Sequence, residues 1–191
     1  MEFKNSKTRV NLMKGFAGES QATERYMMYA KKAKKDGYVK IAKVFEETAL
    51  NERAHAKTFY KLIQENEEHD EIEITASFPM ELGTTSENLQ YAANGENGEH
   101  TSMYPEFADV AEEEGYKKVA AKFRMIAKVE AAHEAKFLQL KKLLDEGTFF
   151  EREGKVYWRC LNCGYVVEAE KAPKVCPACD HPQGYFEEYS L

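Results

Sequence analysis

The sequence predicts a mainly α-helical protein: a four-helix bundle with one long crossover, followed by a small β-rich domain that binds a metal through four cysteines. Apolar residues recur at helical spacing through most of the first 146 residues, and one stretch of this region is present twice. All four cysteines fall between Cys160 and Cys179. We expect the helical domain to span residues 1–147 and the cysteine domain residues 148–191.

Glycines and capping residues mark the ends of the predicted helices. Gly37, Gly115 and Gly147 each follow a helical pattern, where glycine can take the left-handed conformation that ends a helix. A capping signal from Thr84 to Glu87 precedes the third helix. The expected helices cover about 6–35, 38–65, 84–114 and 117–146, and residues 66–83 form the crossover.

A Glu-x-x-His pair occurs in both the second and the fourth helix. Glu52 with His55 and Glu130 with His133 each begin fifteen residues after a Gly-Tyr turn. Because three residues of α-helix advance about 300°, the Glu and His of each pair share one face. That face is otherwise apolar, and burying such groups unpaired costs several kcal/mol for each charge. A pair of metal ions removes this cost.

The first and third helices offer further carboxylates. A dinuclear site in a four-helix bundle takes one carboxylate from each of two helices and a Glu-x-x-His from each of the other two. Imidazole adds a nitrogen ligand that suits iron. The remaining histidines, His69, His100 and His181, have no counterpart in the repeat, and we expect them to be solvent-exposed or hydrogen-bonded. The candidate metal ligands are Glu19, Glu52, His55, Glu96, Glu99, Glu130 and His133.

The two copies of the repeat differ in length by one residue. Gly18 lies 19 residues before Gly37, whereas Gly95 lies 20 residues before Gly115. One extra residue in a helix predicts a single-turn π-bulge, a feature that favours functional sites. Pro105 in the same helix should kink it. The alternative is a difference in loop length that has no consequence.

The cysteines form two Cys-x-x-Cys knuckles that are separated by twelve residues. Four thiolates give a tetrahedral site that suits zinc or iron on geometry alone, so a structural zinc ribbon is the alternative to an iron centre. A disulfide framework does not fit a reducing cytoplasm. The candidate ligands are Cys160, Cys163, Cys176 and Cys179.

Composition and charge argue against several classes of protein. The net charge is −6 and no stripe of Lys and Arg is present, which argues against a nucleic-acid partner. The sequence contains no run of 18 or more apolar residues, so it predicts no membrane helix. Residues 1–7 contain no apolar segment that could serve as a signal peptide, so we expect a cytoplasmic protein. No Gly-x-Gly-x-x-Gly follows a predicted strand, so the chain itself should not bind a nicotinamide.

These motifs resemble those of the rubrerythrin family over essentially the whole chain. The resemblance rests on Phe16–Ala22 around Glu19, on both Glu-x-x-His pairs, and on Gly95-Glu96-x-x-Glu99 ahead of Met103-Tyr104-Pro105. It implies a ferritin-like bundle joined to a rubredoxin-like domain. The cysteine segment resembles rubredoxin, except that Asp180 follows the last cysteine where glycine is usual. The aromatic residues available for a small core there are Tyr157, Trp158, Tyr165 and Phe186.

The resemblance also implies roles for the candidate ligands. Glu52 and Glu130 would bridge two iron ions, with Glu19 on one iron, and Glu96 and His133 on the other. Glu99 would bind the first iron in the oxidised state, and His55 would replace it in the reduced state. Tyr26 and Tyr104 would donate hydrogen bonds to the ligating carboxylates. Glu99, His55, Tyr26 and Tyr104 are therefore the expected catalytic residues.

The activity that the resemblance implies is a non-haem di-iron peroxidase in oxidative-stress defence. It would reduce hydrogen peroxide to water with electrons from one iron in the four-cysteine site. The electron donor would be a rubredoxin or a separate NAD(P)H-dependent reductase, and the protein would be a homodimer. Two alternatives remain: a ferroxidase that handles iron, and a helical scaffold with a structural zinc ribbon.

Overall fold

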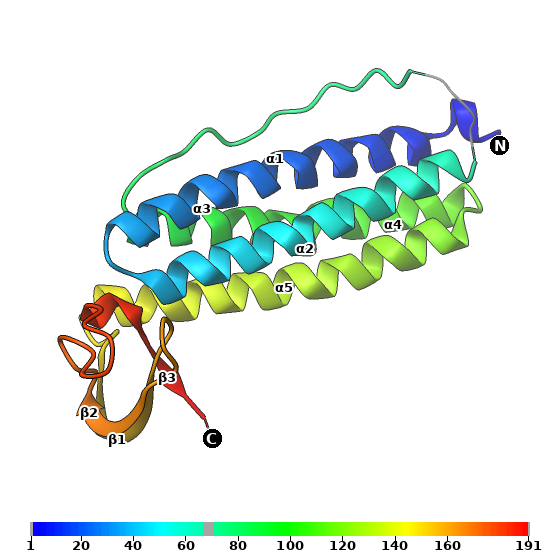
Figure 1. Cartoon of the computed structure of the whole chain (residues 1–191). Coiled ribbons are helices and arrows are strands. Elements are labelled where there is room, and N and C mark those ends of the chain that lie inside the picture. The colour runs from blue at the N-terminus through cyan, green and yellow to red at the C-terminus, as the bar shows by residue number, and fades with distance from the viewer. Residues whose placement is uncertain (1, 67–70, 191) are drawn as a thin grey trace.

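A bundle of four long helical segments carries a small sheet at one end (Figure 1). The computed structural model describes residues 2–66 and 71–190. Three segments are continuous helices, and the segment after the crossover is divided into two α-helices by a π-helical turn, Glu99–Met103. The helices are α1 (Lys7–Lys35), α2 (Val39–Gln64), α3 (Thr85–Gly98), α4 (Tyr104–Glu113) and α5 (Lys117–Asp145), with a short 3-10 turn at Phe3–Asn5.

Polar side chains cap the starts of α1 and α3, the second as predicted, and glycines end the helices. The Ser6 side chain accepts a hydrogen bond from the backbone N–H of Arg9, and Thr84 with Glu87 forms a complete capping box. Gly37 and Gly115 have φ values of 87° and 90°, which L-residues with a side chain rarely adopt. Both Gly-Tyr turns therefore connect their helices in the same conformation.

The crossover after α2 runs along the outside of the bundle beside α1 (Figure 1). Two hydrogen bonds fasten its described part, residues 71–84, to α1. Arg9 donates to the carbonyl of Glu71 at 3.1 Å, and the hydroxyl of Tyr29 donates to the carbonyl of Glu81 at 2.8 Å. His69 lies outside the described residues.

The predicted π-bulge is confirmed, and the alternative of an inconsequential loop difference is wrong. The π-helical turn Glu99–Met103 ends two residues before Pro105, which lies in the first turn of α4. Because proline has no N–H, it cannot continue the regular hydrogen-bond pattern of the preceding helix. The hydroxyls of Thr101 and Ser102 bond to the carbonyls of Asn97 and Gly98, at 2.6 and 3.0 Å. The extra residue is thus absorbed inside the helix that carries Glu96 and Glu99.

The apolar core of the bundle consists of two clusters. One contains Tyr29, Phe45 and Phe137, and the other contains Phe59 and Phe123. Along each of the four helical segments, the candidate metal ligands lie between the residues of one cluster and those of the other. The ligand layer is therefore closed off by apolar packing on both sides along the bundle axis.

The C-terminal sheet is antiparallel, with the strand order β2-β1-β3. Its core contains Trp158 and Phe186 with Cys160 and Cys176, and Tyr165 packs against them. The expectation that Tyr157 belongs to this core is wrong, because Tyr157 is 37 % exposed. Successive side chains of a strand face opposite sides, so burying Trp158 turns Tyr157 outward. The strands are β1 (Glu151–Cys160), β2 (Val166–Lys171) and β3 (Phe186–Tyr189).

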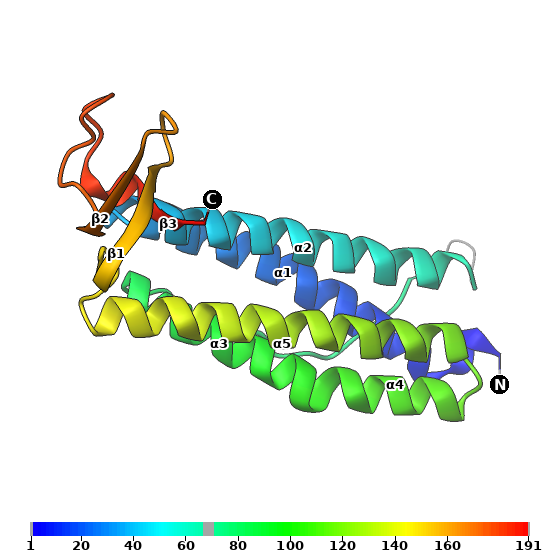
Figure 2. The same ribbon diagram turned by 90° about the horizontal axis from the view of Figure 1, so that it is seen from below.

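The sheet domain contacts the bundle at the turn between α1 and α2 (Figure 2). A Cβ added to Gly184 would lie 2.1 Å from the carbonyl oxygen of Gly37, so only glycine permits this approach. Lys40 of α2 forms an ion pair with Glu187 of β3 at 2.7 Å. Tyr38 stacks on Phe150, with ring centroids 6.0 Å apart. These contacts hold the cysteine domain against one end of the bundle.

Candidate metal centres

The bundle brings six of the seven predicted carboxylate and histidine ligands into two overlapping groups. Glu19, Glu52, His55 and Glu130 form one group, and Glu52, Glu96, Glu130 and His133 form the other. Within each group the ligand atoms lie within 4.8 Å of one another. Glu52 and Glu130 belong to both groups, so each can contribute to two adjacent metal ions.

Both histidines direct Nδ1 at the two shared carboxylates. Nδ1 of His55 lies 3.0 Å from Glu52 and 3.0 Å from Glu130. Nδ1 of His133 lies 2.8 Å from Glu130 and 3.1 Å from Glu52. The three-residue spacing on α2 and α5 produces this arrangement, because it puts each histidine about one turn from its own glutamate.

The burial of the carboxylates fits a site that holds cations. Glu19, Glu52, Glu96 and Glu130 are each at most 1 % exposed. Among the described residues, Oε2 of Glu19 and Oε2 of Glu96 have no hydrogen-bond partner. Buried carboxylates are costly unless they are paired or bound to metal, so two cations between the groups would satisfy these oxygens.

The electrostatics of the metal-free site divide the glutamates into two kinds. Burial raises the pKa of Glu19 well above its usual range, and burial raises that of Glu96 to about 7. Burial also acts on Glu52, but hydrogen bonds from His133 and His55 outweigh it and lower the pKa of Glu52 to about 2. Glu52 is therefore an anion across the neutral range.

The histidines carry the complementary charge when no metal is bound. Burial lowers their affinity for a proton, but the facing carboxylates outweigh it. The pKa of His55 rises to about 9 through Glu130 and Glu52, and that of His133 rises to about 12. The same carboxylates that raise the pKa of these histidines are those that two metal ions would neutralise, and metal binding would release the protons.

Two tyrosines fix the terminal carboxylates. The hydroxyl of Tyr26 donates to Oε1 of Glu96 at 2.5 Å, and the hydroxyl of Tyr104 donates to Oε1 of Glu19. Burial and the nearby carboxylates raise the pKa of both tyrosines, so both keep their protons. Each glutamate thus has one oxygen held by a tyrosine and one oxygen free for a ligand.

Glu99 lies outside both ligand groups. It is the first residue of the π-helical turn, one turn beyond Glu96. Burial raises the pKa of Glu99 well above its usual range, and the charges of Glu96 and Glu130 add to this shift. His55, and not Glu99, belongs to the ligand groups, but the charge of Glu99 adds to burial in raising the pKa of Glu19, so the Glu99 carboxyl lies near that ligand.

Sequence reasoning missed one contact to a ligand. The amide nitrogen of Asn51 lies 3.3 Å from Nε2 of His133, on the ring side away from the carboxylates. The repeat offers no signal for it, since the equivalent position in the second copy is Val129. The other two described histidines make hydrogen bonds, as expected: His100 with Glu134 at 2.6 Å, and His181 with the carbonyl of Cys179 at 3.1 Å.

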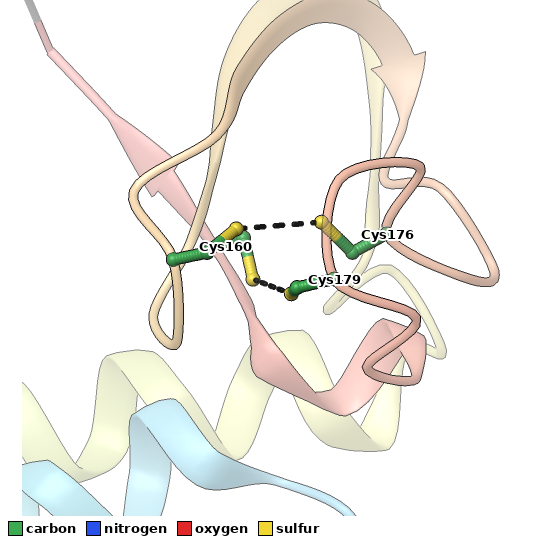
Figure 3. A group of neighbouring side chains, drawn as sticks. Cys160, Cys176 and Cys179 are labelled. Atoms are coloured by element: carbon green, nitrogen blue, oxygen red, sulfur yellow. Dashed lines mark hydrogen bonds between the residues drawn. The ribbon is translucent and has the colours of Figure 1, made fainter.

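The four cysteines converge in the C-terminal domain, and none forms a disulfide (Figure 3). Sγ of Cys160 lies 3.8 Å from that of Cys179, and Sγ of Cys163 lies 3.7 Å from that of Cys176. The backbone N–H of His181 lowers the pKa of Cys179 to about 6, which favours the thiolate that a metal binds. Asp180 has a φ of 59°, a conformation that glycine adopts most easily and Asp tolerates.

A buried carboxylate–histidine site in a four-helix bundle, joined to a four-cysteine site, defines the class of non-haem di-iron proteins with a rubredoxin-like centre. Comparison with known proteins agrees. Residues 11–141 match the rubrerythrin family, and residues 158–187 match the family described as "Rubrerythrin, rubredoxin-like domain". The chain belongs to the rubrerythrin family.

Individual relatives cover nearly the whole chain. Rubrerythrin-1 of Clostridium acetobutylicum is 54 % identical over 185 residues, which are 96 % of this chain and 95 % of the relative. Rubrerythrin of Porphyromonas gingivalis is 55 % identical over 96 % of this chain and 90 % of its own. The solved structure of fully reduced, all-ferrous nigerythrin is 31 % identical, with a TM-score of 0.66, covering 99 % of this chain and 94 % of that one.

The predicted fold class and cofactors are confirmed. The chain is a mainly helical, ferritin-like bundle with a small C-terminal sheet, and it carries a di-iron carboxylate–histidine site and a rubredoxin-like four-cysteine iron site. None of the helices within residues 2–66 and 71–190 combines the length and the apolarity that crossing a bilayer requires.

Proposed function

We propose that this protein is a peroxidase that reduces hydrogen peroxide to water in oxidative-stress defence. The observation that carries the proposal is the shared pair Glu52 and Glu130 between two histidines, with the additional, partly buried carboxyl of Glu99 beside it. A symmetric dinuclear site does not require such a carboxyl. We assign residues 1–147 to peroxide reduction and residues 148–191 to electron delivery.

The proposed ligand set follows the two groups. Glu52 and Glu130 would hold both iron ions, because each belongs to both groups. Glu19 would hold one iron, and Glu96 with His133 would hold the other. Glu99 would complete the first iron's ligands in the oxidised site, and His55 would do so in the reduced site. This last assignment is supported by the position of Glu99 outside the groups while His55 lies within one.

The overall reaction breaks one O–O bond and forms two O–H bonds, and it consumes two electrons and two protons. When bound, the two iron ions supply one electron each and act as Lewis acids toward oxygen. The protons must come from side chains or water. Glu99 is the proposed donor, since its raised pKa keeps the carboxyl protonated at a pH where an ordinary glutamate is ionised.

The residues around the ligands orient them and limit the access of water. Tyr26 and Tyr104 hold Glu96 and Glu19 in place, as hydrogen bonds to metal ligands commonly do. The apolar clusters on either side, with Phe45 and Phe59, exclude water along the bundle axis. Peroxide would thus be reduced in a site whose ligands are pre-oriented and which apolar side chains close on both sides along the bundle axis.

Electron delivery is proposed to involve a second copy of the chain. The cysteine domain contacts the bundle at Gly37 and Lys40, whereas Glu52 lies twelve residues farther along α2. Twelve helical residues span about 18 Å, and electron transfer slows steeply with distance. We propose a homodimer in which each cysteine domain serves the di-iron site of its partner. The external donor is a rubredoxin or an NAD(P)H-dependent reductase.

The unpaired cysteines fit a reducing compartment, so we propose that the reaction takes place in the cytoplasm. The test of the proposed function is a stopped-flow comparison of two oxidants. Anaerobically reduced, iron-loaded protein is mixed with hydrogen peroxide in one experiment and with dioxygen in another. Peroxide should reoxidise the di-iron site much faster than dioxygen. Equal or faster reoxidation by dioxygen would favour the ferroxidase instead.

A further inference from the structure

A buried arginine lies beside the di-iron site without a described anionic partner. Arg25 is 6 % exposed, and its guanidinium lies over the rings of Tyr26 and Tyr29, at 5.3 and 6.0 Å. Nε and Nη1 have no hydrogen-bond partner among the described residues. Because a buried, unpaired charge is costly, a guanidinium in this position calls for a carboxylate or another anion.

Arg25 forms part of the wall of a cavity of about 460 Å³ between α1, the crossover and the π-helical turn. Its guanidinium also lies close to the backbone of α3. A Cβ added to Gly95 would be 3.5 Å from Nη2 of Arg25. Gly95 precedes Glu99 by about one helical turn, so the guanidinium and the Glu99 carboxyl lie at neighbouring positions along α3 and its π-helical extension.

Glu99 is the one acidic side chain among the residues that line this cavity. The other cationic residue in the lining, Lys14, lies eleven residues before Arg25 along α1, about three helical turns away, and is partly exposed. Arg25 is therefore the buried cation available to Glu99 on the cavity side, while Glu96 and Glu130 repel it from the metal side.

We propose that Arg25 is a positioning residue whose guanidinium donates a hydrogen bond to the Glu99 carboxyl group in the cavity when His55 replaces Glu99 on the first iron. This inference rests on the proposed function, in which Glu99 leaves the first iron on reduction. A contact made in one ligand arrangement and not in the other shifts the equilibrium between them by its own free energy. Arg25 thus favours the reduced arrangement, in which His55 is the ligand.

The test is a redox titration of the di-iron site in wild type, R25Q, E99A and R25Q/E99A, with iron content measured for each. R25Q should lower the midpoint potential of the di-iron site by about 59 mV, a tenfold change for a one-electron couple. In the E99A background the same substitution should cause little shift, because the carboxylate is gone. The double-mutant cycle separates this coupling from the loss of a nearby charge.

Two further variants keep the test decisive. R25K keeps the charge but loses the planar fork, and it should give a smaller shift than R25Q that also disappears in E99A. K14Q removes a charge from the same cavity and should leave the potential unchanged. Equal shifts in the presence and absence of Glu99, or no shift at all, would overturn the role of Arg25. Since no peroxide is used, a failed peroxidase assignment gives a different result from a failed role for Arg25.

Discussion

The first helix pair, α1 and α2, and the second pair, from α3 to α5, place equivalent residues in equivalent positions up to one point. His55 lies against the same two shared carboxylates, Glu52 and Glu130, as His133 does. The tyrosine contacts cross between the pairs, from Tyr26 to Glu96 and from Tyr104 to Glu19. The pairs diverge at Glu99, whose counterpart three residues after Glu19 is the buried Ala22.

This difference separates what the duplication provides from what the extra residue adds. The two equivalent halves together supply four carboxylates and two histidines that can bind two metal ions. The π-helical turn in the second half adds a partly buried carboxyl that has no counterpart in the first half. The symmetric part of the site therefore accounts for metal binding, and the asymmetric part accounts for the proposed chemistry.

The largest effect is expected from removing the asymmetric carboxyl. E99Q should lower peroxide turnover by about 10²–10⁴-fold, the usual contribution of a general acid, while both iron ions remain bound in the reduced protein. Steady-state kinetics with hydrogen peroxide and iron analysis measure both quantities. E106Q, a carboxylate on α4 outside the site, is the matched control. Unchanged turnover in E99Q would remove Glu99 from the mechanism.

Substitution of the two histidines should affect iron binding differently, although both histidines face the shared carboxylates in the same way. H133Q should weaken iron binding in both oxidation states, by more than the roughly 10–100-fold typical of residues that only support a ligand. H55Q should weaken it mainly in the reduced state, because Glu99 takes its place in the oxidised state. Iron retention after exposure to a chelator, with oxidised and with reduced protein, measures this. Identical losses for both variants would contradict the asymmetry.

The two tyrosines, by contrast, should behave alike. Y26F and Y104F each remove one hydrogen bond to a terminal carboxylate, from Glu96 and from Glu19. Each should lower iron affinity or turnover by about 10–100-fold, the range found for residues that orient metal ligands. Metal titration and peroxide kinetics on both variants check the symmetry. An effect in one variant only would show that the halves differ beyond Glu99.

The two Gly-Tyr turns share a conformation but not a neighbour, since Gly184 packs on Gly37 and the Gly115 turn lies at the other end of the bundle (Figure 1). G184A should destabilise the docked arrangement of the cysteine domain by about 1–3 kcal/mol, the cost of overpacking. Limited proteolysis near residues 146–151 should then be faster. G154A, where a Cβ meets nothing within 4 Å, is the control. Equal cleavage of both would argue against fixed docking.

The smallest effects concern two acidic residues that precede these turns. Glu114 accepts hydrogen bonds from the backbone N–H groups of Lys7 and Thr8, both at 2.9 Å, and Asp36 accepts one from the Thr85 hydroxyl at 2.7 Å. E114Q should lower the free energy of unfolding by about 1 kcal/mol, as loss of a helix cap does, and D36N should lower it by less. Thermal unfolding of metal-free protein measures both.

The pH dependence of these two contributions has a definite sign. Partial burial raises the pKa of Glu114 and of Asp36, but hydrogen bonds outweigh it and lower both below their usual ranges. Each contribution is therefore present above the ordinary carboxyl pKa and is lost as the pH falls through the lowered value. The difference between wild type and E114Q should shrink on acidification. A difference that grows toward low pH would contradict the capping role.

Much of the fold could be predicted because local signals agreed with one another. The capping box at Thr84, the turns at Gly37 and Gly115 and the extra residue before Pro105 each have a local physical cause, and the structure confirms them. Tyr157 was assigned wrongly because composition names the aromatic residues of a small core but not the strand face that each one occupies.

The contacts beyond the ligands could not be predicted. Asn51 and Arg25 lie on helices whose patterns give no reason to single them out. Their neighbours, His133 and the cavity beside Glu99, come from other helices and depend on how the helices pack. Comparison of the two copies of the repeat identifies functional residues that occur in both. It cannot identify a functional residue that occurs in only one copy.

We propose that electrons pass from the di-iron site to peroxide and are then replaced by electrons from the cysteine site. The most direct test is to mix fully reduced, iron-loaded protein with one equivalent of hydrogen peroxide and follow the visible absorption of the oxidised four-cysteine iron centre. In wild type this absorption should appear after the di-iron site is oxidised, and in H133Q it should appear far more slowly. Oxidation of the cysteine site at the same rate in both proteins would contradict the claim.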